Sequence, residues 1–67
     1  MQKTEEIATS PRWASYTDAE RLYGLSRWTL WRLLKDDRIR AARIGRAVRL
    51  DCASIEAYLE RRAENFE

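Results

Sequence analysis

The side chains with the clearest chemical role in this sequence are its arginines and lysines, which gather in the middle of the chain. Residues 21–49 contain nine basic and two acidic side chains, a charge of +7, whereas residues 1–20 carry −2 and residues 50–67 carry −3. Such a concentration of cations is typical of a surface that binds a polyanion. A solvated basic surface without a partner has the same composition, so charge alone leaves both interpretations open.

Histidine and cysteine, two residue types that are common in catalytic sites and zinc sites, are nearly absent. The sequence has no histidine and one cysteine, Cys52, which excludes an intramolecular disulfide and removes the usual ligands of a zinc site. No glycine-rich phosphate loop occurs, and Cys52 has no evident base partner. We therefore expect no enzyme activity, no catalytic or metal-binding residues, no cofactor and no small-molecule ligand. Cys52 is interpreted as a small packing residue.

The length of 67 residues and the apolar content of 45% predict a single small domain with one core. No apolar stretch is long enough for a signal peptide or a transmembrane helix, so we expect a cytoplasmic protein without a membrane partner.

Two short helices are predicted on either side of a tight turn. Thr17 and Glu20 match a capping box, so the first helix is expected to start after Thr17 and to end at Gly24, which suits a left-handed helix end. Ser26 is a good N-cap for a second helix that runs to about Asp37. The second helix has an apolar stripe formed by Leu30, Leu33 and Leu34. Its opposite face carries Trp28, Arg32 and Lys35.

A hairpin and a last helix follow. Apolar and polar residues alternate over residues 39–44 and 47–50, which flank Gly45 and predict two β-strands. Asp51 is expected to cap a last helix that ends near Arg62. The residues expected to pack that helix on the others are Ile55, Tyr58 and Leu59.

The length of the hairpin loop decides which residues pair. A three-residue loop, residues 45–47, would pair Arg43 with Arg49 and keep the apolar side chains on the other face. A two-residue loop would instead pair Arg43 with Val48 and mix the two faces. We therefore expect the three-residue loop.

The order of helix, helix, hairpin and helix predicts a mainly α-helical winged helix-turn-helix with a two-stranded wing. It would occupy residues 16–62, between a partly flexible N-terminal tail, residues 1–15, and a C-terminal tail, residues 63–67. In such domains the second helix enters the major groove, and an arginine-bearing wing follows phosphates or enters a narrow minor groove. The expected DNA-binding residues are Ser26, Arg27, Trp28, Thr29, Arg32 and Lys35 in the recognition helix and Arg43, Gly45, Arg46 and Arg49 in the wing.

The sequence also resembles the excisionase-like small winged helix-turn-helix domains, or recombination directionality factors, which are related to the MerR DNA-binding domain. The resemblance covers residue 16 to about residue 62 and rests on residues 16–20 (YTDAE), 24–27 (GLSR), 32–34 (RLL), 43–46 (RIGR), 48–50 (VRL) and 55–59 (IEAYL). One departure is Trp28, where the family usually has a small polar residue. Trp28 could contact DNA or pack on the N-terminal tail through Trp13.

The resemblance implies a protein of a phage or mobile element in a bacterial host cell. It would bind tandem sites on double-stranded DNA, bend them, and direct a tyrosine integrase toward excision. A single module reads few base pairs, so we expect head-to-tail self-association on direct repeats. Two alternatives stay open, a small transcriptional regulator that uses the same face and a protein-interaction module that uses an acidic row on the last helix. That row is Glu56, Glu60 and Glu64.

Overall fold

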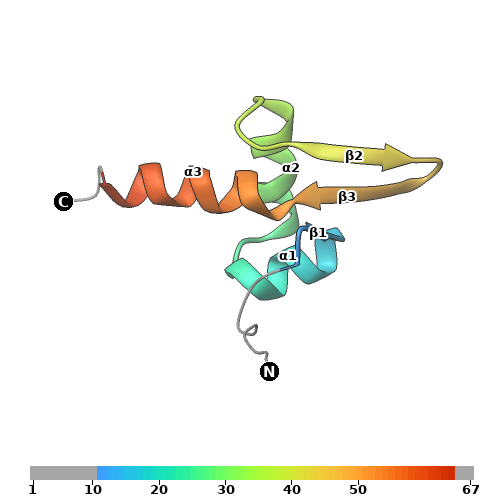
Figure 1. Cartoon of the computed structure of the whole chain (residues 1–67), viewed down its shortest axis with the longest axis horizontal. Coiled ribbons are helices and arrows are strands. Elements are labelled where there is room, and N and C mark those ends of the chain that lie inside the picture. The colour runs from blue at the N-terminus through green and yellow to red at the C-terminus, as the bar shows by residue number, and fades with distance from the viewer. Residues whose placement is uncertain (1–10, 65–67) are drawn as a thin grey trace, which may run out of the picture.

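The computed structural model describes residues 11–64, which form three helices and a three-stranded antiparallel sheet (Figure 1). In chain order the elements are β1 (Trp13–Ala14), α1 (Tyr16–Tyr23), α2 (Arg27–Lys35), β2 (Ala41–Ile44), β3 (Ala47–Asp51) and α3 (Cys52–Glu64). The strand order is β1-β3-β2, so β3 is the central strand. The hairpin of β2 and β3, which we call the wing, extends to one side of α1 and α2, and α3 extends to the opposite side. The predicted winged helix-turn-helix is confirmed.

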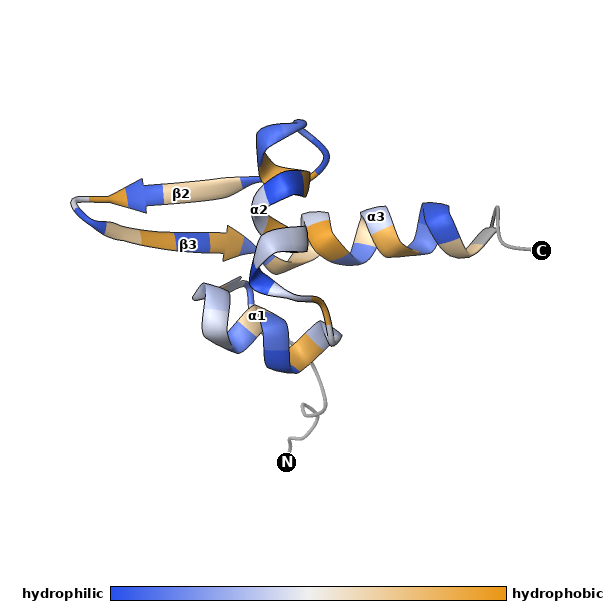
Figure 2. Cartoon of the chain, turned by 180° about the vertical axis from the view of Figure 1, so that it is seen from behind, coloured by the Kyte–Doolittle hydropathy of each residue, from blue (hydrophilic) through white to orange (hydrophobic). Residues whose placement is uncertain are grey.

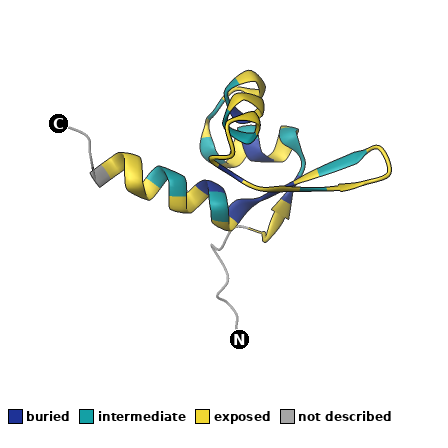
Figure 3. Ribbon diagram, turned by 90° about the horizontal axis from the view of Figure 1, so that it is seen from above, coloured by how far each residue is buried: buried dark blue, intermediate teal, exposed yellow. Residues whose placement is uncertain are grey.

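The core lies where α1, α2, the base of the wing and the first turn of α3 meet. Leu30 of α2, Leu50 of β3 and Ile55 of α3 are completely buried. Ala14, Ala19, Ile39 and Cys52 complete the buried cluster. The predicted packing residues Leu33, Leu34, Tyr58 and Leu59 lie partly buried against it. Outside this cluster, most of the wing and the outer turns of α3 are exposed (Figure 3).

The start of α1 differs from the prediction. Ser15, not Thr17, is the N-cap, because Ser15 has an extended backbone and its Oγ accepts the backbone N–H of Asp18 at 3.1 Å. The predicted capping box of Thr17 and Glu20 is therefore wrong, and the helix begins at Tyr16, before Thr17. Its predicted end is confirmed, since Gly24 has φ +68° and its backbone N–H donates to the carbonyl of Glu20.

The predicted cap of α2 is confirmed, whereas its end is earlier than expected. The Ser26 Oγ accepts the backbone N–H of Thr29 at 3.1 Å. The last helical residue is Lys35, and Asp37 already has a positive φ of 60°. A non-glycine residue in that conformation terminates the helix before the predicted end.

The wing has a different register from the predicted one. Its loop has two residues, Gly45 and Arg46, so Arg43 pairs with Val48 and Ala42 pairs with Arg49. Arg43 and Arg49 therefore lie on opposite faces of the wing. The prediction assumed that one face of the hairpin is buried, but the wing projects from the core and leaves Ile44 71% exposed. Burial therefore does not fix the register. The turn fixes it, because Gly45 has a positive φ and Arg46 does not, which is typical of a two-residue type II′ turn.

The strand β1 lies inside the segment that we expected to be a tail. Trp13 pairs with Asp51 and Ala14 pairs with Leu50, so β1 extends the sheet at the base of β3. Because this strand has only two residues, it has no period that the sequence could reveal. The helix α3 also continues to Glu64, past the expected end near Arg62. The remainder of the two predicted tails, residues 1–10 and 65–67, lies outside the described residues.

A buried carboxylate holds the base of the wing. Asp51 is 2% exposed, and its Oδ1 accepts the backbone N–H of Ala53 at 3.1 Å, which confirms that it caps α3. The Arg12 Nε lies 3.1 Å from the same oxygen, and the Arg40 Nη1 lies 3.5 Å from Oδ2. One side chain thus joins the segment before β1, the start of the wing and the first turn of α3.

Candidate nucleic-acid interface

The outward face of α2 carries the side chains that the sequence placed there. Leu30 is buried on the inner side, whereas Trp28, Arg32 and Lys35 are all exposed. Ser26 and Thr29 take part in capping, because the Ser26 Oγ also donates to the Thr29 Oγ1 at 2.9 Å. The capping hydrogen bonds hold the first turn of α2, and the cations and aromatic rings further along form its exposed surface.

Each cation of α2 lies over an aromatic ring. The Arg27 guanidinium is 5.2 Å from the centroid of the Tyr16 ring. The Arg32 guanidinium is 5.6 Å from the Trp28 ring, and the Lys35 Nζ is 5.4 Å from the Trp31 ring. Such cation–π contacts restrict long side chains, so less conformational entropy is lost when they bind a ligand.

Two of these cations have additional partners. The Arg27 Nη2 donates to the Thr17 Oγ1 at 3.0 Å, which links α2 to the first turn of α1. The Arg32 Nε lies 3.4 Å from the Asp36 Oδ2 one turn later on the helix. This second pair is exposed and weak, so an incoming anion can replace Asp36 at little cost.

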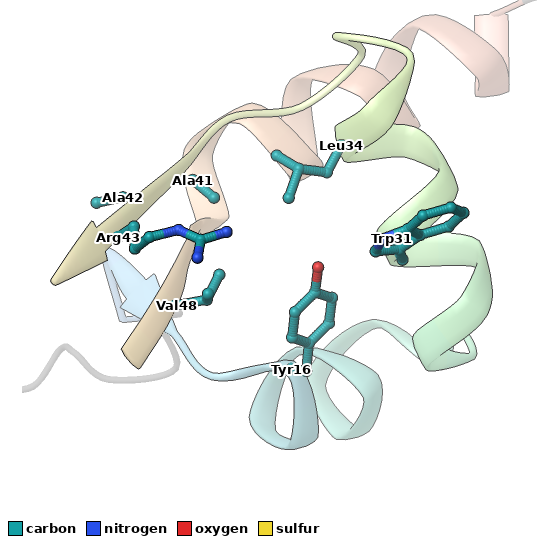
Figure 4. Close-up of a pocket in the computed structure, with 7 residues that line it drawn as sticks. All are labelled: Tyr16, Trp31, Leu34, Ala41, Ala42, Arg43 and Val48. Carbon is teal, nitrogen blue, oxygen red and sulfur yellow. The ribbon is translucent and has the colours of Figure 1, made fainter. Parts of the chain in front are cut away.

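A hollow of about 250 Å³ separates α2 from the wing. Its lining is Tyr16, Trp31 and Leu34 on the helical side and Ala41, Ala42, Arg43 and Val48 on the wing. The guanidinium of Arg43 points from β2 into this hollow, and the Tyr16 hydroxyl points into it from α1 (Figure 4). The observed register explains why Arg43 faces α2, because it shares one side of the wing with Val48.

A second hollow, of about 300 Å³, lies between β3 and the start of α1. Three arginines line it, Arg27 from α2 and Arg46 and Arg49 from the wing, together with Ser15, Tyr16, Thr17, Ala47 and Val48. The Arg49 Nη1 donates to the Val48 carbonyl at 3.0 Å. Several guanidinium groups and hydroxyls around one open hollow suit the oxygens of a phosphate group.

Acidic side chains lie on α3. Glu56 and Glu60 are exposed there, and the Tyr23 hydroxyl donates to the Glu56 carboxylate. Since α3 and the wing extend in opposite directions, the basic and acidic surfaces are separated in space (Figure 1). Both hydrophobic and hydrophilic residues occur along the wing and along α3 (Figure 2). Within residues 11–64, no helix is long and apolar enough to cross a membrane. The same residues contain no group of three His, Cys, Asp or Glu side chains that could hold a metal ion.

Comparison with known proteins identifies the family. A model described as a helix-turn-helix domain matches residues 15–63, more than half of the chain. The protein belongs to the helix-turn-helix domain family. This is a DNA-binding family that includes excisionase-like proteins and is typically without enzyme activity, and membership indicates sequence-specific binding of double-stranded DNA. Neither the curated proteins nor the solved structures gave a significant match.

The main residue that sequence reasoning left out of this helix-turn-helix site is Tyr16. It lines the two hollows described above and a third, of about 460 Å³, with Arg27, Trp28 and Trp31. Tyr16 therefore joins the start of α1, the outward face of α2 and the wing into one continuous surface. The sequence contained a signal for it, because Tyr16 begins the segment YTDAE. Its position under Arg27, however, depends on how α1 packs on α2.

Proposed function

We propose that this domain binds double-stranded DNA through the continuous surface formed by the start of α1, the outward face of α2 and the wing, which we call the reading face. The observation that carries this proposal is the set of three adjoining hollows that share Tyr16, with Arg27, Arg43, Arg46 and Arg49 among their lining residues. Phosphates on both sides of a groove require cations on more than one element. Arginines on α2 and on both strands of the wing meet that requirement.

Within the reading face, α2 and the wing have different tasks. The outward face of α2 enters the major groove, where Arg32 forms hydrogen bonds with base edges after it releases Asp36. The wing residues Arg43, Arg46 and Arg49 contact the backbone, and Arg46 beside Gly45 at the tip reads the width of a flanking minor groove.

This division of tasks predicts the behaviour of two substitutions. A preferred site is first selected from random duplexes and binding is measured by fluorescence anisotropy. Arg32→Ala should weaken binding to the preferred site by roughly 5–150-fold, equivalent to about 1–3 kcal/mol, and should affect random duplex much less. Arg46→Ala should weaken binding most when the flanks are A-tracts. Equal losses on preferred and random duplex for Arg32→Ala would contradict the assignment.

We further propose that the protein acts as an excisionase, in which copies bind direct repeats head to tail, bend the DNA and direct a tyrosine integrase toward excision. The wing and α3 extend in opposite directions. A basic wing on one copy could therefore contact the exposed Glu56 or Glu60 on the α3 helix of its neighbour. A single module of this size buries only about 600–1,000 Å² on DNA, so additional contacts are required to find one locus.

The array is tested with duplexes that carry one, two or three copies of the site, combined with circular-permutation measurements of bending. Each added direct repeat should tighten binding per site and increase the bend. Glu60→Lys should remove the cooperativity and leave single-site binding nearly unchanged, whereas the matched exposed change Arg62→Glu should retain cooperativity. A preference for inverted repeats would refute the array and favour a symmetric transcriptional regulator.

A further inference from the structure

The centre of the outward face of α2 is occupied by a tryptophan. At 100° per residue, the direction opposite the stripe of Leu30, Leu33 and Leu34 falls on Trp28. Trp28 is 62% exposed, and Trp31 on the next turn is 46% exposed. Two adjacent exposed indoles on a small domain indicate a contact surface, because large apolar side chains are normally buried.

These indoles border a hollow with an apolar lining and a cationic rim. The third hollow, of about 460 Å³, is lined by Tyr16, Arg27, Trp28 and Trp31. The cations lie over these rings, with Arg27 on Tyr16, Arg32 on Trp28 and Lys35 on Trp31. A ligand that fits this surface has apolar groups in its centre and negative charges on its edges.

The major groove of DNA has this distribution. Phosphates line its two edges, and its only apolar groups on the base edges are the C5-methyl groups of thymine. The hollow adjoins the one lined by Arg27, Arg46 and Arg49, so phosphate contacts and methyl contacts can form in a single docking. An acidic amphipathic peptide would fit the apolar centre and its cationic rim, but it would make no contact with the arginines of the wing.

We propose that Trp28 and Trp31 determine specificity by packing against thymine C5-methyl groups in the major groove, an inference that rests on the proposed DNA binding. In addition to their own contacts with DNA, Arg32 and Lys35 each lie over one of the two indoles and limit its rotation. The preferred site then contains thymines beneath the first two turns of α2. Because 5-methylcytosine carries a methyl group at the same place in the groove, it substitutes in part for thymine.

The test replaces each thymine of the selected site by uracil, which retains the pairing with adenine and lacks only the methyl group. Uracil at one or two positions should weaken binding by roughly 3–5-fold each, the effect expected for one buried methyl group. Uracil in the flanking sequence is the matched control and should have no effect. Trp28→Ala should weaken binding to the thymine site and remove the difference between thymine and uracil at the affected position.

Combining Trp28→Ala with the uracil substitutions distinguishes the possible outcomes. If uracil lowers affinity by factors that are independent of both Trp28→Ala and Trp31→Ala at every thymine, another residue reads the methyl groups and the proposal is wrong. If every uracil is tolerated while the protein still selects its site, thymine-methyl reading is refuted and DNA binding stands. If no duplex is bound at all, the proposed function itself fails. Circular dichroism of Trp28→Ala should match that of the unmodified protein, because this exposed side chain is outside the core.

Discussion

The dependence of DNA binding on salt gives the most quantitative test of the reading face. Six cations of the reading face lie on α2 and on the wing. Within the described residues five of them form no ion pair, since Arg32 alone has a carboxylate partner, Asp36. The five are Arg27, Lys35, Arg43, Arg46 and Arg49. If each neutralises one phosphate, the slope of log K against log salt is about −4.5, because each contact contributes about −0.9.

This slope corresponds to a large loss of affinity. Raising monovalent salt from 50 to 200 mM should weaken binding by roughly 500-fold. Arg46→Ala removes one contact, so its slope should be about −3.6 and its loss over the same range roughly 150-fold. The matched control is Arg61→Ala, which removes the same charge from α3 on the side opposite the wing. Its slope should stay near −4.5.

Fluorescence anisotropy with a labelled duplex at five or six salt concentrations measures both slopes. A slope near zero for the unmodified protein would show that the reading face makes no phosphate contacts. An equal change of slope for Arg61→Ala and Arg46→Ala would contradict the assignment of Arg46 to a phosphate. Overall net charge would then explain binding, and the geometry of the wing would be irrelevant.

Two further predictions concern stability and the wing. Asp51→Ala removes the cap of α3 and the partner of Arg12 and Arg40, so the free energy of unfolding in urea should fall by about 2 kcal/mol. A loss below about 0.5 kcal/mol would show that the buried carboxylate has no structural role. Gly45→Ala places a methyl group on a residue with φ +59°, and no atom lies within 4 Å of that position. The free energy of unfolding should therefore fall by about 1–2 kcal/mol through backbone strain alone. A chemically synthesised chain with D-alanine at this position should avoid that cost, and equal destabilisation by both forms would contradict the turn geometry.

The parts of the fold that were predicted correctly depend on local features of the sequence. The cap at Ser26, the helix end at Gly24 and the apolar stripe of α2 each follow from a few neighbouring residues. The errors occurred where a distant contact decides the outcome. The N-cap Ser15 comes directly after strand β1 in the chain, and this strand forms by pairing with the distant strand β3. The predicted loop of the wing is wrong because it requires one face of the hairpin to be buried, whereas the hairpin projects into solvent and Ile44 is exposed.

The candidate site shows the same contrast. The sequence predicted that Trp28, Arg32 and Lys35 share one exposed face, since a helical period is enough to place them together. It did not predict that each cation lies over a ring, or that Tyr16 joins three hollows. Those features depend on how α1 packs on α2 and on the direction of the wing, neither of which has a periodic signal.

The position of the wing has to be set from its base. Ile44 near its tip is 71% exposed, so burial of the tip contributes little to folding. At the other end, Leu50 is completely buried, Asp51 holds Arg40 at the start of the wing, and the Arg40 backbone N–H donates to the Ser54 Oγ of α3 at 2.9 Å. Substitutions at the tip should therefore alter DNA binding with little effect on stability, except where backbone strain is introduced. Substitutions at the base should alter both, because the same contacts close the core and set the direction of the wing relative to α2.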